Sequence, residues 1–132
     1  INGHIKKAEK NIQAIRDFYN KGYEDWALSA AFYSIYHAFL AILAKFGYES
    51  RNQECTIAAV EMLIEDKKIE LDKKFVEAVK ESQEKSKTVI ELREDYQYGI
   101  DIKIGKDANI DAITAFCKEA VLAVKKVLYN AP

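Results

Sequence analysis

The stretch WALSAAFYSIYHAFLAILA, from Trp26 to Ala44, carries no formally charged residue in a chain that is 31% charged. Its length reaches the lower limit for a membrane-spanning helix. Hydrocarbon would leave polar side chains inside such a helix poorly satisfied. The stretch contains several of them: Ser29, Tyr33, Ser34, Tyr36 and His37. The composition therefore favours the central helix of a helical bundle over a membrane span.

Two stripes along this stretch support that interpretation. Small residues recur at steps of three and four and allow a second helix to approach closely: Ala27, Ala31, Ser34, Ala38 and Ala41. Large apolar residues form a neighbouring stripe: Leu28, Phe32, Ile35, Phe39 and Ile42. A helix that is apolar nearly all round belongs in lipid or in the middle of a core. The other segments are amphipathic and need a helix to cover, so we expect no membrane association.

The composition predicts a single all-α domain over residues 1–132. With 5 Gly and 1 Pro, the sequence has almost none of the turn residues that a sheet protein uses. The net charge of −1 gives no global electrostatic reason for nucleic-acid binding, although a local patch stays open. Cys55 and Cys117 are far apart and no signal peptide precedes them. We expect a cytoplasmic protein with reduced thiols, and whether the chain is truncated before Ile1 is left open.

Hydrophobic periodicity and capping residues predict about five helices in an up-and-down bundle. The first covers residues 3–19, and the second begins at Glu24 or Asp25 and stops near Gly47. Ser50 or Asn52 caps the third. Asp72 caps a long fourth helix that reaches toward Tyr96, and a last helix begins at Asp107 or Asn109. Residues 98–105 form the least regular segment.

The fourth predicted helix contains an anomaly. Between residues 80 and 88 it has no apolar residue, and Ser82 and Ser86 occupy positions that should face the core. Arg93 and Tyr96 follow further along. One interpretation is a helix whose middle projects past the bundle into water. The other is a polar groove against a neighbouring helix or a second subunit.

His37 is the histidine inside a predicted core element, and Tyr33 and Leu40 share its helix face. A neutral, buried histidine with one hydrogen-bond partner is the ordinary outcome. A general base or an RNA-contacting group is the alternative. The sequence holds no spacing typical of a metal site and no glycine-rich phosphate loop, so we expect no metal and no cofactor.

Several segments resemble the HEPN domain family. They are Lys21-Gly22-Tyr23, the adjoining Asp25-Trp26-Ala27, the run AAFYSIYHAFLAIL, and Phe46-Gly47-Tyr48. The segment from Arg93 to Tyr96 is similar to the Arg-x-x-Tyr ending of the family's fourth helix. The resemblance covers most of the chain. It implies a five-helix bundle that often dimerises. Many HEPN proteins are metal-independent ribonucleases, and others are non-catalytic partners of small nucleotidyltransferases in toxin–antitoxin pairs.

The catalytic signature of the family is an arginine followed, after four to six residues, by a histidine. Arg16, Arg51 and Arg93 have no histidine at that spacing, and His37 has no arginine before it at that distance. Metal-free RNA cleavage needs a group that handles the 2′-hydroxyl proton and a cation that stabilises the phosphorane. Arg93, His37 and Tyr96 supply a substitute only if tertiary packing brings them together.

The sequence therefore predicts a non-catalytic HEPN-like binding module. We expect a homodimer that binds a nucleotidyltransferase, a nucleotide or RNA in a toxin–antitoxin-type system. Its dimer surface is expected at the small-residue stripe or at the polar-gapped fourth helix. The alternative is a metal-independent ribonuclease with a non-standard site, for which the catalytic candidates are His37 and Arg93. The predicted binding residues are Tyr33, His37, Ser82, Ser86, Arg93 and Tyr96.

Overall fold

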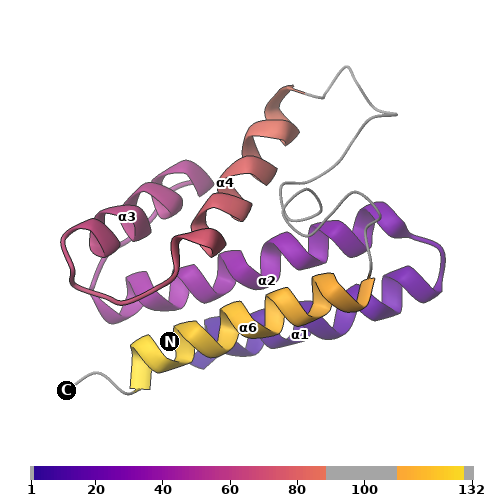
Figure 1. The fold of residues 1–132 in the computed structure, drawn as a ribbon, viewed down its shortest axis with the longest axis horizontal. Coiled ribbons are helices and arrows are strands. Elements are labelled where there is room, and N and C mark those ends of the chain that lie inside the picture. Colours follow the sequence, from indigo (N-terminus) through magenta and orange to yellow (C-terminus); the bar gives the residue numbers. More distant parts are fainter. Residues whose placement is uncertain (1, 89–109, 130–132) are drawn as a thin grey trace.

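The computed structural model of the chain is an all-α bundle (Figure 1). It describes residues 2–88 and 110–129, and side chains within that part except those of residues 82–88. The described residues form five helices: α1 (Asn2–Asn20), α2 (Glu24–Lys45), α3 (Gln53–Glu65), α4 (Lys73–Thr88) and α6 (Ile110–Tyr129). The prediction of an all-helical bundle is confirmed, and the starts and ends of α1 and α2 lie within about two residues of those predicted.

Helices α1, α2 and α6 pack side by side as the main layer of the bundle (Figure 1). α1 and α2 are antiparallel because only a short turn joins them. The Tyr129 hydroxyl at the end of α6 donates to Asn2 Oδ1 at 2.9 Å, and Arg16 pairs with Asp111 at the other end. These two contacts set α6 antiparallel to α1, and therefore parallel to α2.

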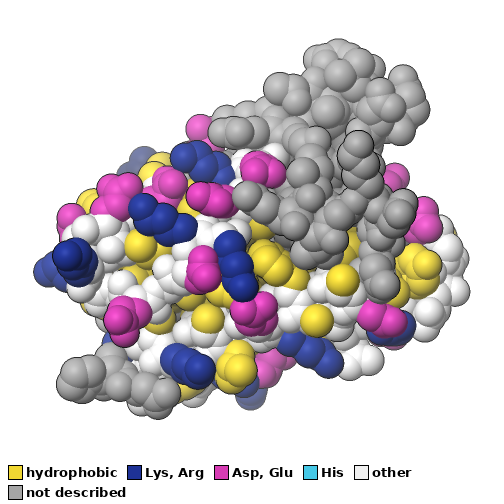
Figure 2. Space-filling view, in the orientation of Figure 1, with side chains coloured by type: hydrophobic (Ala, Val, Ile, Leu, Met, Phe, Trp, Pro, Cys, Tyr) yellow, Lys and Arg dark blue, Asp and Glu magenta, His cyan; other side chains and the backbone are white. Residues whose placement is uncertain are grey.

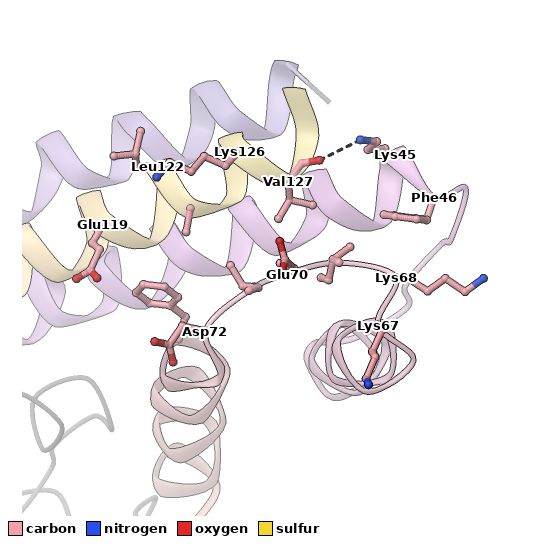
Figure 3. Close-up of a pocket in the computed structure, with 14 residues that line it drawn as sticks. Lys45, Phe46, Lys67, Lys68, Glu70, Asp72, Glu119, Leu122, Lys126 and Val127 are labelled. Atoms are coloured by element: carbon pink, nitrogen blue, oxygen red, sulfur yellow. Dashed lines mark hydrogen bonds between the residues drawn. The ribbon is translucent and has the colours of Figure 1, made fainter. Parts of the chain in front are cut away.

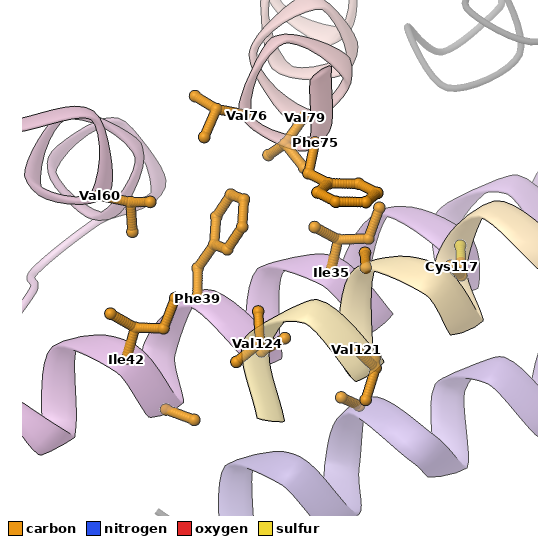
Figure 4. Close-up of a cluster of buried hydrophobic side chains, with 14 of the residues drawn as sticks. Ile35, Phe39, Ile42, Val60, Phe75, Val76, Val79, Cys117, Val121 and Val124 are labelled. Atoms are coloured by element: carbon orange, nitrogen blue, oxygen red, sulfur yellow. The ribbon is translucent and has the colours of Figure 1, made fainter. Parts of the chain in front are cut away.

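The second layer consists of α3 and α4, which pack on α2 and on each other. Between the layers lies the main apolar cluster. Figure 4 shows side chains from α2, α3, α4 and α6 converging there, among them Phe39, Val60, Phe75 and Val124. Because α2 touches every other described helix, its nearly continuous apolar surface is needed to fill both sides of the bundle.

Local residue chemistry explains where the helices begin and end. Gly22 and Gly47 follow α1 and α2 with φ of +85° and +76°, a left-handed conformation that glycine adopts without strain. The Asn52 side chain accepts a 2.8 Å bond from the Cys55 amide and so caps α3. Asp72 Oδ1 accepts a 2.9 Å bond from the Lys74 amide at the start of α4. The Asp72 cap is therefore confirmed, and of the two alternatives for α3, Ser50 and Asn52, the cap is Asn52.

Helix α2 is the one described helix that is long and apolar enough to cross a membrane, and 61% of its apolar window is buried inside the bundle. The small-residue stripe, from Ala27 to Ala41, is buried within this chain. One contact on it is the Cys117 thiol of α6, which lies 3.5 Å from the Ala31 carbonyl. The stripe therefore serves intramolecular packing, and the expectation that it forms a dimer surface was wrong.

The second half of α4 extends beyond the other described helices (Figure 1). Its first turns hold the buried residues Phe75, Val76, Ala78 and Val79, and its backbone then continues to Thr88. The course of the backbone agrees with a helix that projects past the main layer. The side chains of Ser82 and Ser86 and the whole of residues 89–109 lie outside the described part, so the predicted polar groove is not tested.

Candidate functional site

The imidazole of His37 on α2 lies beside that of His4 on α1. Their ring centroids are 6.3 Å apart and the ring planes differ by 19°. The antiparallel pairing of the two helices brings the start of α1 across from the second half of α2. Both side chains are half-buried. The chain therefore places its two histidines together on one surface.

Both histidines have lowered pKa values. Desolvation by burial is the main cause for each; the positive charge of the N-terminal amino group and then that of Lys7 add to it for His4, and that of Lys7 adds to it for His37. His4 also disfavours the protonation of His37, which lowers the pKa of His37 further. Lys7 lies one helical turn from His4, on the same side of α1. At neutral pH the site therefore holds two neutral imidazoles and one ammonium group.

The inner nitrogens of the two imidazoles have no partner. Nδ1 of His4 and Nδ1 of His37 are buried and lack a hydrogen bond within the described part of the chain. Buried polar atoms are almost always paired, so an orphaned pair at one place is unusual. With Nδ1 turned inward, Nε2 is the ring nitrogen that a ligand can reach. The predicted neutral state of His37 agrees with this geometry, but the single partner expected for it is not found.

Two tyrosines extend the site along α2 toward α3. The Tyr33 ring lies 6.2 Å from the His37 ring and is 40% exposed, and its hydroxyl accepts a 3.3 Å bond from Gln53 Nε2 at the start of α3. The ring centroid of Tyr36 lies 5.9 Å from that of His37. The Tyr36 hydroxyl is 3.3 Å from the Thr56 hydroxyl. Together, α1, α2 and the N-terminus of α3 surround one polar and aromatic surface.

We call this set of His4, Lys7, Tyr33 and His37 the imidazole cluster. The sequence predicted that Tyr33 and His37 share a face, and the structure brings them together. It missed His4 and Lys7, because periodicity on α1 marks only the residues that face the core. Their place opposite His37 depends on how far α1 and α2 overlap, which the length of the turn between them determines.

The remaining predicted site residues are not brought to the cluster by anything described. Arg93 and Tyr96 lie outside the described residues, and Ser82 and Ser86 are on α4 at positions whose side chains are not described. No group of three or more His, Cys, Asp or Glu side chains in the described ranges could hold a metal ion. Cys117 and Cys55 are both free, and burial raises the pKa of the Cys117 thiol to about 12.

A groove lies apart from the cluster, between α6, the end of α2 and the connection from α3 to α4. It has a volume of about 750 Å³ (Figure 3). The Lys45 ammonium donates to the carbonyls of Val127 and Leu128 at 3.0 and 3.1 Å and so caps the end of α6. The rim carries lysines and acidic residues together, as does the face seen in Figure 2, on which no histidine is visible. The groove therefore shows no preference for one charge of ligand.

The domain is an all-α bundle. It is built around a long, apolar central helix and carries a polar surface cluster on α1 and α2. The chain belongs to the HEPN domain family, whose family model matches residues 1–128. It is 30% identical over 122 residues to a protein called UPF0332 protein from Archaeoglobus fulgidus, an overlap that covers 92% of this chain and 87% of the relative. No solved structure matches the chain significantly. The resemblance inferred from the sequence is thereby confirmed.

Proposed function

We propose that this protein is a non-catalytic binding module of the HEPN family that holds a nucleotide, free or as part of RNA, at the imidazole cluster. The observation that supports it is the convergence of His4, Lys7, Tyr33 and His37 on one surface. No other described surface combines a cation, imidazoles and an exposed ring in this way.

Each part of the cluster suits one part of a nucleotide. The Lys7 ammonium is a point charge for a phosphate, and neutral imidazoles donate N–H groups to phosphate oxygens. The exposed Tyr33 ring offers a face on which a base stacks, an interaction that tolerates every base. Gln53 bonds the Tyr33 hydroxyl and so restrains the ring. The chain's net charge of −1 fits a small local contact better than a long nucleic-acid track.

The cluster supports binding better than cleavage. Acid–base cleavage of RNA needs one imidazole protonated and one neutral, and the lowered pKa values oppose the protonated form near pH 7. Orphaned Nδ1 atoms mean that neither ring is oriented by a second group, as catalytic histidines usually are. The family's Arg-spacer-His signature is also missing from the sequence.

A metal-independent ribonuclease is the second candidate, and one specific observation favours it. Two imidazoles 6.3 Å apart with a lysine beside them include a base, an acid and a cation, the groups that metal-free cleavage requires. In such a site one imidazole takes the 2′-hydroxyl proton as the 2′-oxygen attacks phosphorus. The other, protonated, gives its proton to the departing 5′-oxygen, and a 2′,3′-cyclic phosphate forms.

One experiment separates the two functions. Binding of a fluorescent RNA hexanucleotide is measured by anisotropy without metal, and the same mixtures are analysed for cleavage in EDTA. The wild type is compared with His37→Gln, His4→Gln and Tyr33→Leu, with Tyr19→Leu as the control for loss of an exposed tyrosine. Binding that weakens in the three cluster variants without cleavage supports the module. Cleavage lost in both histidine variants establishes the ribonuclease, and no binding and no cleavage refutes both.

The homodimer, the nucleotidyltransferase partner, the toxin–antitoxin setting and the cytoplasmic location stay predictions that depend on the family. The sequence indicated two dimer surfaces, the small-residue stripe and the fourth helix. Because the stripe is buried within the chain, α4 beyond Glu81 is the one that remains. Sedimentation equilibrium at rising protein concentration tests it. A mass of one chain, 15.1 kDa, at every concentration would contradict the dimer.

A further inference from the structure

We propose that the imidazole cluster selects a terminal phosphate monoester, as in a nucleoside monophosphate or a phosphorylated RNA end, over an internal phosphodiester. This inference rests on the proposed function, because it specifies which part of a nucleotide the cluster recognises. It is carried by the adjacent imidazoles of His4 and His37, whose ring centroids are 6.3 Å apart, with Lys7 one helical turn from His4 on α1.

The site favours an anion. Lys7 follows His4 by one turn of α1, and its positive charge contributes to the lowered pKa of both histidines. The same positive charge would repel a metal ion, and within residues 2–88 and 110–129 no acidic side chain is among the groups that shift the pKa of the pair. α3 adds the neutral Gln53, which donates to the Tyr33 hydroxyl, and its first turn also carries Glu54, so the N-terminus of α3 adds no net positive charge to the cluster.

The number of negative charges on the ligand then decides how strongly it favours protonation of the two histidines. Lys7 alone balances the single negative charge of a phosphodiester. A terminal phosphate carries close to two negative charges near pH 7, so one charge would be left unbalanced beside His4 and His37. A nearby negative charge raises the pKa of an imidazole. Binding of the dianion therefore favours protonation of the His4–His37 pair more strongly than binding of a monoanion does.

On binding, the protein combines with the dianionic monoester and with one proton from solution. The proton rests on the His4–His37 pair. No bond to phosphorus forms or breaks. The charged and titratable groups that bear on this proton are the N-terminal amino group, Lys7 and the other imidazole, with Tyr33 and Tyr36 from α2 itself. A monoanionic diester causes uptake of fewer protons, because it supplies half the negative charge.

Three ligands that share one base test the proposal by titration calorimetry at about pH 7. They are adenosine 5′-monophosphate, its 3′,5′-cyclic diester and adenosine. Each is run in two buffers of different ionisation enthalpy, which gives the protons taken up. We expect the monophosphate to bind at least about tenfold more tightly than the cyclic diester, the equivalent of one pKa unit. We also expect proton uptake with the monophosphate that falls in His4→Gln and in His37→Gln.

A matched pair of lysine variants controls for general charge. Lys7→Gln is expected to weaken both phosphate ligands, whereas Lys21→Gln, in the turn between α1 and α2, is expected to leave them unchanged. Circular dichroism melts show that each variant folds. A hexanucleotide with and without a 5′-phosphate then distinguishes the two sources of the group. A phosphate-dependent gain there identifies an RNA end, and a gain confined to the mononucleotide identifies a free nucleotide.

The results that would overturn the terminal-phosphate preference differ from the result that would overturn nucleotide binding. Equal affinity for monophosphate and cyclic diester, or no proton uptake, overturns the terminal-phosphate preference while nucleotide binding stands. Preference and proton uptake that persist in both histidine variants place the phosphate elsewhere and also overturn the proposal. No binding of any of the three ligands or of the hexanucleotide refutes the proposed function, and the preference with it.

Discussion

The two sides of α2 differ in how completely their polar atoms are paired. On the core side, Ser34 is fully buried and its hydroxyl donates to the Ala31 carbonyl at 2.7 Å. Where α2 meets the start of α1, the buried Nδ1 atoms of His37 and His4 have no hydrogen-bond partner among the residues that the structure describes. A buried, unpaired polar atom costs free energy. The paired Ser34 hydroxyl contributes to stability, whereas the two unpaired Nδ1 atoms cost some, and the Nε2 atoms of the same rings are the ones that a ligand can reach.

The largest expected effect is on the core side. Phe39 is fully buried between the two layers (Figure 4). We expect Phe39→Ala to lower the free energy of unfolding by about 3–5 kcal/mol, because it removes a large apolar side chain and leaves a cavity. Urea denaturation followed by circular dichroism measures the loss. Phe46→Ala, at an exposed position, is the control and is expected to cost far less; equal losses would contradict the assignment of the core.

The small-residue stripe gives the next effect. Ala31 is completely buried, and its carbonyl faces both Ser34 and Cys117. We expect Ala31→Leu to cost about 1–3 kcal/mol, because the added atoms must displace α1 or α6. Leucine and alanine have similar helix propensities, so propensity explains little of the loss. Ala58→Leu on the exposed side of α3 is the matched control, and a tolerated Ala31→Leu would show that the helices are not in close contact there.

The fold was largely readable from the sequence, because each helix carries its own start and stop signals. Asn52 and Asp72 cap their helices as predicted, and Gly22 and Gly47 end theirs. The scarcity of glycine and proline had already excluded a sheet. The sequence could not show which helices the small-residue stripe contacts, since a stripe of alanines suits a neighbouring helix of the same chain as well as one of a second chain.

The candidate site was harder to predict from the sequence than the fold. Tyr33 and His37 are one turn apart, so their shared face follows from helix geometry alone. His4 is 33 residues earlier in the chain, and its approach to His37 depends on the register between two packed helices. Periodicity does not encode that register. For the same reason, no pattern linked Lys7 to either histidine.

A third prediction concerns a polar group that does have partners. Lys45 donates to two carbonyls at the end of α6, where a cation is also favoured by the helix dipole. We expect Lys45→Met, which keeps most of the apolar stem, to lower the free energy of unfolding by about 1 kcal/mol. Lys126→Met removes a nearby exposed lysine and is expected to change little. If both variants lose the same amount, the capping bonds contribute nothing specific.

The smallest effect is on the histidine side, and it depends on pH. Burial and Lys7 lower the pKa of His4 and His37 in the folded protein below the ordinary value of 6.5 that the unfolded chain keeps. Between the folded and unfolded pKa values the unfolded chain binds more protons, so the free energy of unfolding rises with pH in that window and these groups add no further slope above pH 6.5. Urea denaturation of the wild type and of the double variant His4→Gln/His37→Gln across this range measures the difference in slope. The variant should have the flatter profile. If the two profiles are parallel, protonation of the pair does not oppose folding, and the dianion-dependent proton uptake proposed for the cluster loses its physical basis.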